Sequence, residues 1–355
     1  MGVTLFEPPA LDPSKAHIEN ILDLTPVSDI GPDVFTNTRP LWHPPGARGI
    51  YGGAAIAQSL AAAQLTVGPE FSPHSMHCYF VLAGDSQLPI IYHVERVRDG
   101  RSFATRTVQA RQKGRPIFTT TLSFDREGGG GEKKVEHSTR KPDIPLPPAN
   151  GIVDDRGPFE TRRAGILNRT SSQPETKAVR QFIRARGHIS AAGSHQAHLS
   201  ALAYMSDSYF IGTIARVQDI PRFSSPEALK RVLSKLKNPS DLDSETIARA
   251  LKDLTDQESS EIKAQLMQGS EVMIPKPKRE IGMMVSLDHT IYFHNRRGFR
   301  ADDWLFVEMT SPWAGDGRGL VMQKIWSQDG TLVATCVQEG VVRLKQDSAS
   351  KPNKL

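Results

Sequence analysis

The sequence predicts an α+β fold that is built twice from the same parts, a buried helix followed by an antiparallel sheet. The first observation behind this prediction is an internal repeat. Ser75–Phe80 and Asp288–Phe293 are alike, and each is followed by an Asp-Gly-Arg turn, at 99–101 and 316–318. The second observation is that a run of helix formers precedes the strand-like segments in both halves. A repeat of this kind indicates one fold used twice along the chain.

In the first half, residues 52–67 are rich in alanine and apolar almost all round, which is typical of a helix that is buried on most sides. Gln58 is one of three strongly polar residues in this run, with Ser59 and Gln64, and we expect its amide to be hydrogen-bonded in the core. Segments bounded by Gly, Pro or Asp follow the helix, as expected of strands joined by turns. Strands are predicted at 75–82, 89–98, 102–112 and 116–125.

The second half repeats this order of elements. A helix is predicted at 198–208. Strands are predicted at about 285–295, 303–312, 319–327 and 331–344. Because helices and strands do not alternate, a doubly wound parallel sheet is excluded.

The domain boundaries follow from composition. Four consecutive glycines at 128–131 open a polar stretch that runs into the proline-rich segment 142–148, and such a sequence is typical of a linker. Charged helical sequence at 224–270 interrupts the second half, and its apolar stripe suits a covering helix, a lid or a subunit contact. The predicted divisions are a first domain at 20–125, a linker at 126–178, a second domain at 179–346 and a polar tail at 347–355.

Composition excludes several classes of protein. The 44 Lys and Arg residues are scattered among 39 Asp and Glu, so the net charge of +5 suits an anionic metabolite and indicates no nucleic-acid surface. Cys78 and Cys336 lack the spacing of a disulfide framework or a metal site, which indicates a reducing compartment. No apolar run approaches the roughly 20 residues of a membrane span, and the N-terminus has no signal-peptide pattern, so we expect synthesis in the cytosol.

Three polar residues on predicted strands of the second half are candidates for catalysis: Asp288, Thr310 and Gln338. When the repeats are superimposed, Asp288 falls on Ser75 and Gln338 on Leu122, so the second half has polar groups that the first lacks. If the strands bring the three side chains to one face, they can hold a water molecule. The carboxylate then accepts a proton, while hydroxyl and amide fix the direction of attack. Common nucleophile, phosphate-loop and zinc-helix motifs are absent from the sequence.

Four motifs, in this order, resemble the type II acyl-CoA thioesterases, the TesB-like family with bacterial and peroxisomal members. They are Arg48–Gln58, His74–Phe80, Leu287–His294 and Val337–Gly340. The likeness covers about residues 20–125 and 180–345. It implies a double hotdog fold, in which each of two tandem domains wraps an antiparallel sheet around a central helix. It also implies hydrolysis of fatty acyl-CoA to free fatty acid and CoA.

The resemblance further implies roles for the three candidates. Asp288 maps to the family's catalytic Asp, Thr310 to its Thr or Ser hydroxyl, and Gln338 to its Gln. We therefore expect direct attack by water on the thioester, with neither a covalent acyl-enzyme nor a cofactor. The oxyanion is expected to bind backbone N–H groups at a helix start, from Gly52-Gly53 or from the helix at 198–208. The alternative for Asp288 is a turn cap or an ion pair with a nearby arginine.

The C-terminal tripeptide Asn353, Lys354 and Leu355 differs from the peroxisomal signal Ser-Lys-Leu only at its first residue. Peroxisomal import through an import receptor is therefore a hypothesis, and otherwise the protein is expected in the cytoplasm. The competing function is a hotdog module that binds acyl-CoA without hydrolysing it, for which loss of one of the three polar residues would be the signature. A hotdog hydratase would need a Gly-Asp-x-Asn-Pro-like loop, which is absent. Acyl chain length and formation of a homo-oligomer stay open.

Overall fold

The computed structural model describes residues 4–44, 47–129, 131–147, 157–191, 194–220 and 279–346. The helical insertion predicted at 224–270 and the tripeptide Asn353, Lys354 and Leu355 lie outside the described residues. Within the described ranges, no helix is both long enough and apolar enough to cross a membrane.

The predicted elements are present, with ends shifted by a few residues. The first half consists of α1 (His17–Leu22), β1 (Leu24–Pro26), β2 (Val34–Asn37), α2 (Gly52–Gln64), β3 (Phe71–Phe80), β4 (Ile91–Asp99), β5 (Phe103–Gln112) and β6 (Arg115–Arg126). The second half consists of β7 (Phe159–Leu167), β8 (Ala178–Ala185), α3 (Ser194–Ser206), α4 (Thr213–Val217), β9 (Ile281–Ser286), β10 (Asp288–Phe293), β11 (Leu305–Gly315), β12 (Arg318–Trp326) and β13 (Leu332–Leu344). The α+β class predicted from the sequence is therefore confirmed.

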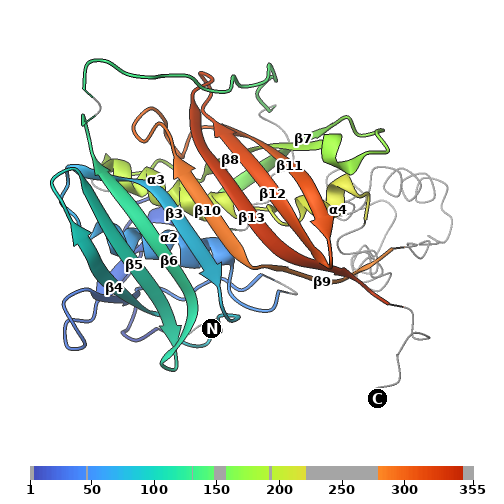
Figure 1. Cartoon of the computed structure of the whole chain (residues 1–355). Helices are drawn as coiled ribbons and strands as arrows, with labels where there is room; N and C mark the ends of the chain where they lie inside the picture. Colours follow the sequence, from blue (N-terminus) through green and yellow to red (C-terminus); the bar gives the residue numbers. More distant parts are fainter. Residues whose placement is uncertain are drawn as a thin grey trace.

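One continuous antiparallel sheet runs through both halves (Figure 1). Its order is β1-β2-β4-β5-β6-β3-β10-β13-β12-β11-β8-β7, and β9 pairs with β13. Each half thus repeats the same arrangement, β2-β4-β5-β6-β3 in the first and β8-β11-β12-β13-β10 in the second. The two halves meet where β3 pairs with β10.

The register between β3 and β10 shows that the repeat is a two-fold relation in space. Met76 pairs with Ile291, and Cys78 pairs with His289. In the superposition of the repeats, Met76 falls on His289 and Cys78 on Ile291. When the first half is laid on the second, the pair Met76–Ile291 therefore falls on the pair His289–Cys78. Met76 is thus the structural counterpart of His289.

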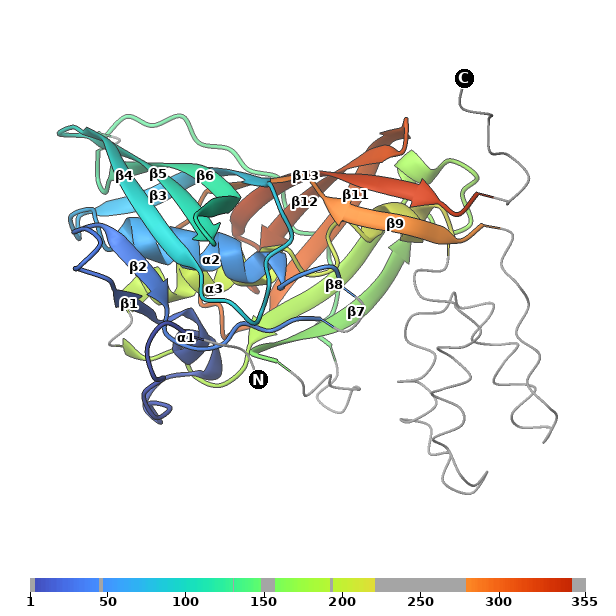
Figure 2. The ribbon, with the colours of Figure 1, turned by 90° about the horizontal axis from the view of Figure 1, so that it is seen from below.

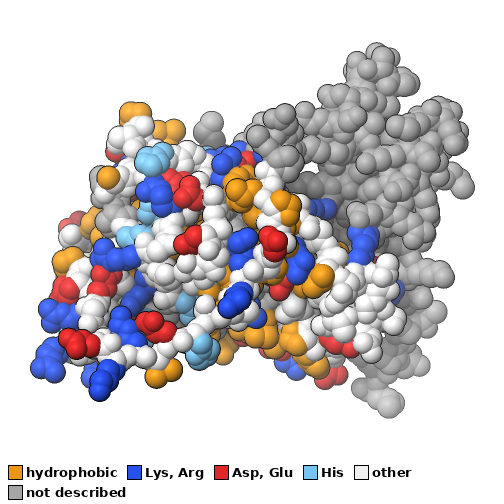
Figure 3. Space-filling view, turned by 90° about the horizontal axis from the view of Figure 1, so that it is seen from above, with side chains coloured by type: hydrophobic (Ala, Val, Ile, Leu, Met, Phe, Trp, Pro, Cys, Tyr) orange, Lys and Arg blue, Asp and Glu red, His pale blue; other side chains and the backbone are white. Residues whose placement is uncertain are grey.

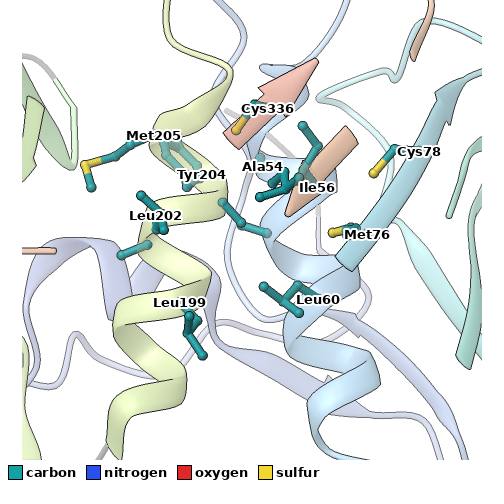
Figure 4. Close-up of a cluster of buried hydrophobic side chains, with 14 of the residues drawn as sticks. Ala54, Ile56, Leu60, Met76, Cys78, Leu199, Leu202, Tyr204, Met205 and Cys336 are labelled. Carbon is teal, nitrogen blue, oxygen red and sulfur yellow. The ribbon is translucent and has the colours of Figure 1, made fainter. Parts of the chain in front are cut away.

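Helices α2 and α3 lie together against the inner face of this sheet (Figure 2). They are antiparallel, because Tyr51 at the start of α2 donates its hydroxyl to the carbonyl of Tyr204 near the end of α3, at 2.9 Å. Figure 4 shows the two helices side by side, with Met76 of β3 directed toward α2. The predicted core amide is also present: Gln58 accepts a hydrogen bond from Tyr92 at 2.7 Å.

The linker predicted at 126–178 is wrong over part of its length. Residues 159–167 form β7, which pairs with β8 and belongs to the second half. Its charged residues concealed the strand, because Glu160 and Arg162 are both buried and form ion pairs rather than facing water. On the surface in Figure 3, basic and acidic side chains are interspersed, as the even scatter of charges in the sequence predicts.

Candidate active site

Gln338 lies on β13 with its side chain on the inner face of the sheet, toward α2 and α3. It is fully buried, and so are Val321, which pairs with it on β12, and His289 on the neighbouring strand β10. Successive residues of a strand point to opposite faces. The residues next to Gln338 along β13 therefore point outward, and any partner of its amide has to reach the inner face.

Asp288 points to the outer face. It pairs with Tyr79, whose side chain is 61% exposed, and its carboxylate accepts a hydrogen bond from the backbone N–H of Glu339 at 2.6 Å. Burial raises the pKa of the Asp288 carboxyl, and the bond from the Glu339 amide offsets that rise in part. Asp288 thus supports the junction of β10 and β13, a role close to the turn cap considered from the sequence.

Thr310 also points to the outer face. It pairs with Met322 on β12, whose side chain is 40% exposed. Two strand spacings, about 10 Å, separate β11 from β13 within the sheet. The expectation that Asp288, Thr310 and Gln338 share one face is therefore wrong, because only Gln338 is on the inner side.

The carboxylate that does meet Gln338 comes from Asp207, the residue after the end of α3. Gln338 Nε2 donates a hydrogen bond to Asp207 Oδ1 at 2.9 Å. The same amino group contacts His289 Nδ1 at 3.0 Å. Gln338 Oε1 is buried and has no hydrogen-bond partner among the described residues. An acceptor oxygen without a partner, next to a carboxylate, is suited to accept a hydrogen bond from water.

Two glycines bring the start of α2 against this carboxylate. A Cβ atom on Gly52 would stand 2.7 Å from Asp207 Oδ2, and one on Gly53 would stand 2.3 Å from the backbone oxygen of Tyr204. A side chain at Gly52 would displace the Asp207 carboxylate or the Phe80 ring, and one at Gly53 would push the backbone of α3 away from α2. In the described part of the chain, the first hydrogen bond from an N–H group of α2 is that of Ala54 to Tyr51, so the two glycine N–H groups remain available at the positive end of a 13-residue helix.

A bulge between β9 and β10 adds a hydroxyl to the same face. Thr290 pairs with Val337 and Ser286 pairs with Gly340, so four steps on one strand match three on the other. This extra residue keeps both Ser286 and His289 on the inner side. Ser286 therefore lies on the same face as Gln338, because its partner Gly340 is two residues after Gln338 on β13.

The corresponding place in the first half is apolar. Met76 pairs with Leu122, and both are fully buried. They stand where the second half has His289 and Gln338, as the superposition of the repeats predicts for Gln338. After α2, Leu65 occupies the position that Asp207 has after α3. Of these two equivalent places, only the one in the second half therefore carries the polar cluster.

Sequence reasoning missed Asp207 and Ser286. Leu65 and Asp207 both fall inside the predicted helices, 52–67 and 198–208, and they become equivalent only when the observed helix ends, Gln64 and Ser206, are aligned. For Ser286 the signal is weaker, since the bulge that turns it inward leaves no trace in the residue pattern. As for metals, the described residues contain no group of three or more His, Cys, Asp or Glu placed to hold an ion.

Comparisons with known proteins identify the family of the chain. Two family models match, the acyl-CoA thioesterase N-terminal domain at residues 39–125 and the acyl-CoA thioesterase C-terminal domain at 136–342. The chain is 32% identical to human acyl-coenzyme A thioesterase 8, covering 97% of this chain and 94% of that protein. It is 25% identical to the peroxisomal acyl-coenzyme A thioester hydrolase 1 of Saccharomyces cerevisiae, covering 93% and 95%.

A solved structure is similar over the same length. The acyl-CoA thioesterase II TesB2 of Mycobacterium marinum matches with a TM-score of 0.62 and 29% identity, covering 94% of this chain and 99% of that one. The predicted double hotdog fold is confirmed by these likenesses and by the two family models together. The match at 136–342 also places the start of the second domain well before residue 179.

Proposed function

This chain belongs to the acyl-CoA thioesterase family and is a hydrolase of acyl-CoA thioesters, and we propose that Asp207, Gln338 and Ser286 carry out the reaction with the start of α2. The observation that supports this set is the 2.9 Å bond from Gln338 Nε2 to Asp207 Oδ1 beside Gly52. Asp288 and Thr310, which the resemblance had suggested, are not part of the proposal because they lie on the outer face of the sheet.

Water is the nucleophile in the proposed reaction. Asp207 accepts one proton of the water, and Gln338 Oε1 accepts a hydrogen bond from the other, which directs the water's lone pair at the thioester carbon. The Ser286 hydroxyl adds a further hydrogen bond from the same face. The role of Gln338 is the one predicted from the sequence, with a different carboxylate as its partner.

The negative charge that develops on the thioester oxygen needs donors that are already in place. The N–H groups of Gly52 and Gly53 fit this need, because they are fixed at a helix start and the helix dipole adds positive potential there. Of the two sources considered from the sequence, Gly52-Gly53 is the one adjacent to Asp207. Donors of this kind contribute about 10²- to 10³-fold each to the rate in other hydrolases.

The intermediate then collapses. The C–S bond breaks, the electron pair goes to the sulfur of CoA, and the proton held by Asp207 passes to that sulfur. Thiols have a pKa near 8.5, so the thiolate is a good leaving group and one carboxylic acid suffices to protonate it. The products are a carboxylic acid and CoA, and the carboxylate of Asp207 is restored.

The first experiment measures release of free thiol from short, medium and long fatty acyl-CoAs, with the wild type and with Gln338→Ala. We expect hydrolysis by the wild type and a fall in kcat of about a hundredfold in the variant. The panel also gives the preferred chain length. If the wild type binds acyl-CoA and releases no thiol, the alternative function of a non-catalytic acyl-CoA-binding module replaces this proposal.

We also propose that the chain is imported into peroxisomes through Asn353, Lys354 and Leu355. Support comes from the tripeptide's likeness to Ser-Lys-Leu and from the yeast relative, which is named as a peroxisomal thioester hydrolase. A fluorescent protein fused in front of the full chain should be punctate, and removal of the three residues should make it diffuse. An unchanged location after truncation would end this proposal.

Formation of a homo-oligomer stays a prediction, and light scattering on the purified protein tests it.

A further inference from the structure

We infer that His289 is a positioning residue for the thioesterase reaction: held by Ser206, it fixes which way the amide of Gln338 faces. The inference rests on the proposed function, because it takes Gln338 as a residue that contacts the attacking water. Its basis is a chain of hydrogen bonds that runs from the last turn of α3 through β10 to β13. Both ring nitrogens of His289 are already engaged, Nε2 with Ser206 Oγ and Nδ1 with the amino group of Gln338, so His289 acts through Gln338 and not on the substrate.

The direction of each bond in this chain follows from the chemistry of its members. Ser206 Oγ donates to the carbonyl of Ala203 at 2.8 Å, which uses its one hydrogen. His289 Nε2 lies 3.0 Å from the same oxygen and therefore donates to it. A neutral imidazole has one N–H, so Nδ1 is an acceptor and the amino group of Gln338 donates to it at 3.0 Å.

The imidazole of His289 is neutral near neutral pH. Burial lowers the pKa of His289 to about 3. Its ring is also packed edge-on against Phe210, with centroids 5.4 Å apart. Nδ1 therefore keeps its lone pair and its place, which makes it a fixed acceptor.

Gln338 is then held in one orientation. Both hydrogens of its amino group are used, one by His289 Nδ1 and one by Asp207 Oδ1. A flipped amide would bring its oxygen against two acceptors at once. In the observed orientation Oε1 alone is left without a partner among the described residues, which is the atom that the proposed reaction requires.

The first half of the molecule shows that the fold does not need this chain of bonds. At the equivalent positions, Met76 and Leu122 fill the space with apolar contacts, and both are fully buried. A histidine in this place costs desolvation that the methionine does not. The polar chain is therefore explained by what it does for Gln338 and not by packing.

The experiment is a double-mutant cycle on kcat and KM for thiol release from an acyl-CoA, with His289→Phe, Gln338→Ala and the double variant. Phenylalanine keeps the ring and removes both nitrogens. We expect kcat of His289→Phe to fall about 10- to 100-fold with KM little changed, the scale of losing orientation at a reacting group. In the Gln338→Ala background the same change should have no further effect, because His289 acts through Gln338.

Two further variants keep the result interpretable. Met76→Leu is the matched control at the equivalent buried position and should leave kcat unchanged. Ser206→Ala removes the acceptor of Nε2–H without disturbing the ring, so it should lower kcat in the same direction and also lose its effect in the Gln338→Ala background. It carries the test if His289→Phe does not fold, as judged by thermal unfolding.

The outcomes are distinct. Loss of kcat in His289→Phe that persists undiminished in Gln338→Ala would overturn the positioning role, as would unchanged kcat in both His289→Phe and Ser206→Ala. If Gln338→Ala itself retains full activity, the proposed function of this site fails, and that result is read from the single variant alone.

Discussion

Gly52 and Gly53 lie where the start of α2 touches the end of α3, and their lack of side chains decides the geometry there. Only hydrogen at these Cα atoms lets Asp207 approach the helix end and lets the Tyr204 carbonyl lie against the backbone. Neither glycine has a positive φ, so the requirement is one of space and not of conformation. The carboxylate and the proposed oxyanion donors are brought together by this close approach.

Replacement of Gly52 by alanine tests this point. The new Cβ would stand 2.7 Å from Asp207 Oδ2 and 2.9 Å from the Phe80 ring. We expect kcat for thiol release to fall at least about tenfold, since displacement of a reacting group by 1 Å costs up to 10²-fold. The control is Gly31→Ala, whose Cβ meets a Val34 methyl at 3.2 Å and should leave kcat unaltered. Full activity of Gly52→Ala would show that the helix start takes no part.

At the residue scale, the sequence predicted Gln338 and missed its partner. Gln338 was a candidate because it replaces Leu122 in a strand, where the two halves can be superimposed residue by residue, and it stays one in the proposed site. Asp288 replaces Ser75 in the same way, yet it faces outward. The residue types alone do not show which face a side chain is on, because a shift of one residue moves it to the other face. Asp207 was missed because the helix predicted at 198–208 included it, whereas α3 ends at Ser206, and because it lies outside the strands in which the two halves are alike.

At the scale of elements, the bulge between β9 and β10 has the largest effect on the site. Four residue steps facing three keep both Ser286 and His289 on the inner side, where a regular ladder would turn one of them outward. The strand predicted at about 285–295 corresponds to β10, and most of β9 was not predicted. Their residues do not indicate the bulge, because 283–285 are all apolar and 288–290 are all polar, so neither side of it shows an alternation that would reveal a change of face.

Loss of the Ser286 hydroxyl should show whether the inward turn matters for function. Ser286→Ala is expected to lower kcat about tenfold, the scale of losing one hydrogen bond to a charged transition state, about 1.5 kcal/mol. Thr310→Ala is the matched control, since it removes a hydroxyl from the outer face. An equal effect of the two variants on kcat would contradict the assignment of Ser286 to the site.

At the scale of the whole molecule, one fold is used twice and the polar machinery is kept in one copy. The sequence predicted this arrangement well, because the repeat is strong in the strands and turns that build each sheet. It failed where ion pairs bury charge, as in β7, since a buried Glu160 reads as a surface residue. In the proposed reaction the first copy contributes the N–H groups of Gly52 and Gly53, so we expect both halves to be needed for activity.

Buried histidines should make the folded molecule sensitive to acid. Desolvation by burial lowers the pKa of His289 to about 3 and that of His195 to about 4, against about 6.5 when unfolded. Below pH 6.5 the unfolded chain binds more protons than the folded one, so the free energy of unfolding should decrease as the pH falls toward 4. Thermal unfolding across this range measures it, and His289→Phe should reduce the slope. A Tm that is constant from pH 7 to 4.5 would contradict the prediction.

The central claim is that the carboxylate on the inner face, and not the one on the outer face, activates the water. The direct measurement is kcat for thiol release from the best acyl-CoA substrate, with Asp207→Asn and Asp288→Asn assayed side by side at equal folded concentration. We predict a fall of at least about a hundredfold in Asp207→Asn and a change of less than about threefold in Asp288→Asn. Retained activity in Asp207→Asn together with loss in Asp288→Asn would contradict this claim and support the prediction from the sequence that Asp288 is the catalytic carboxylate.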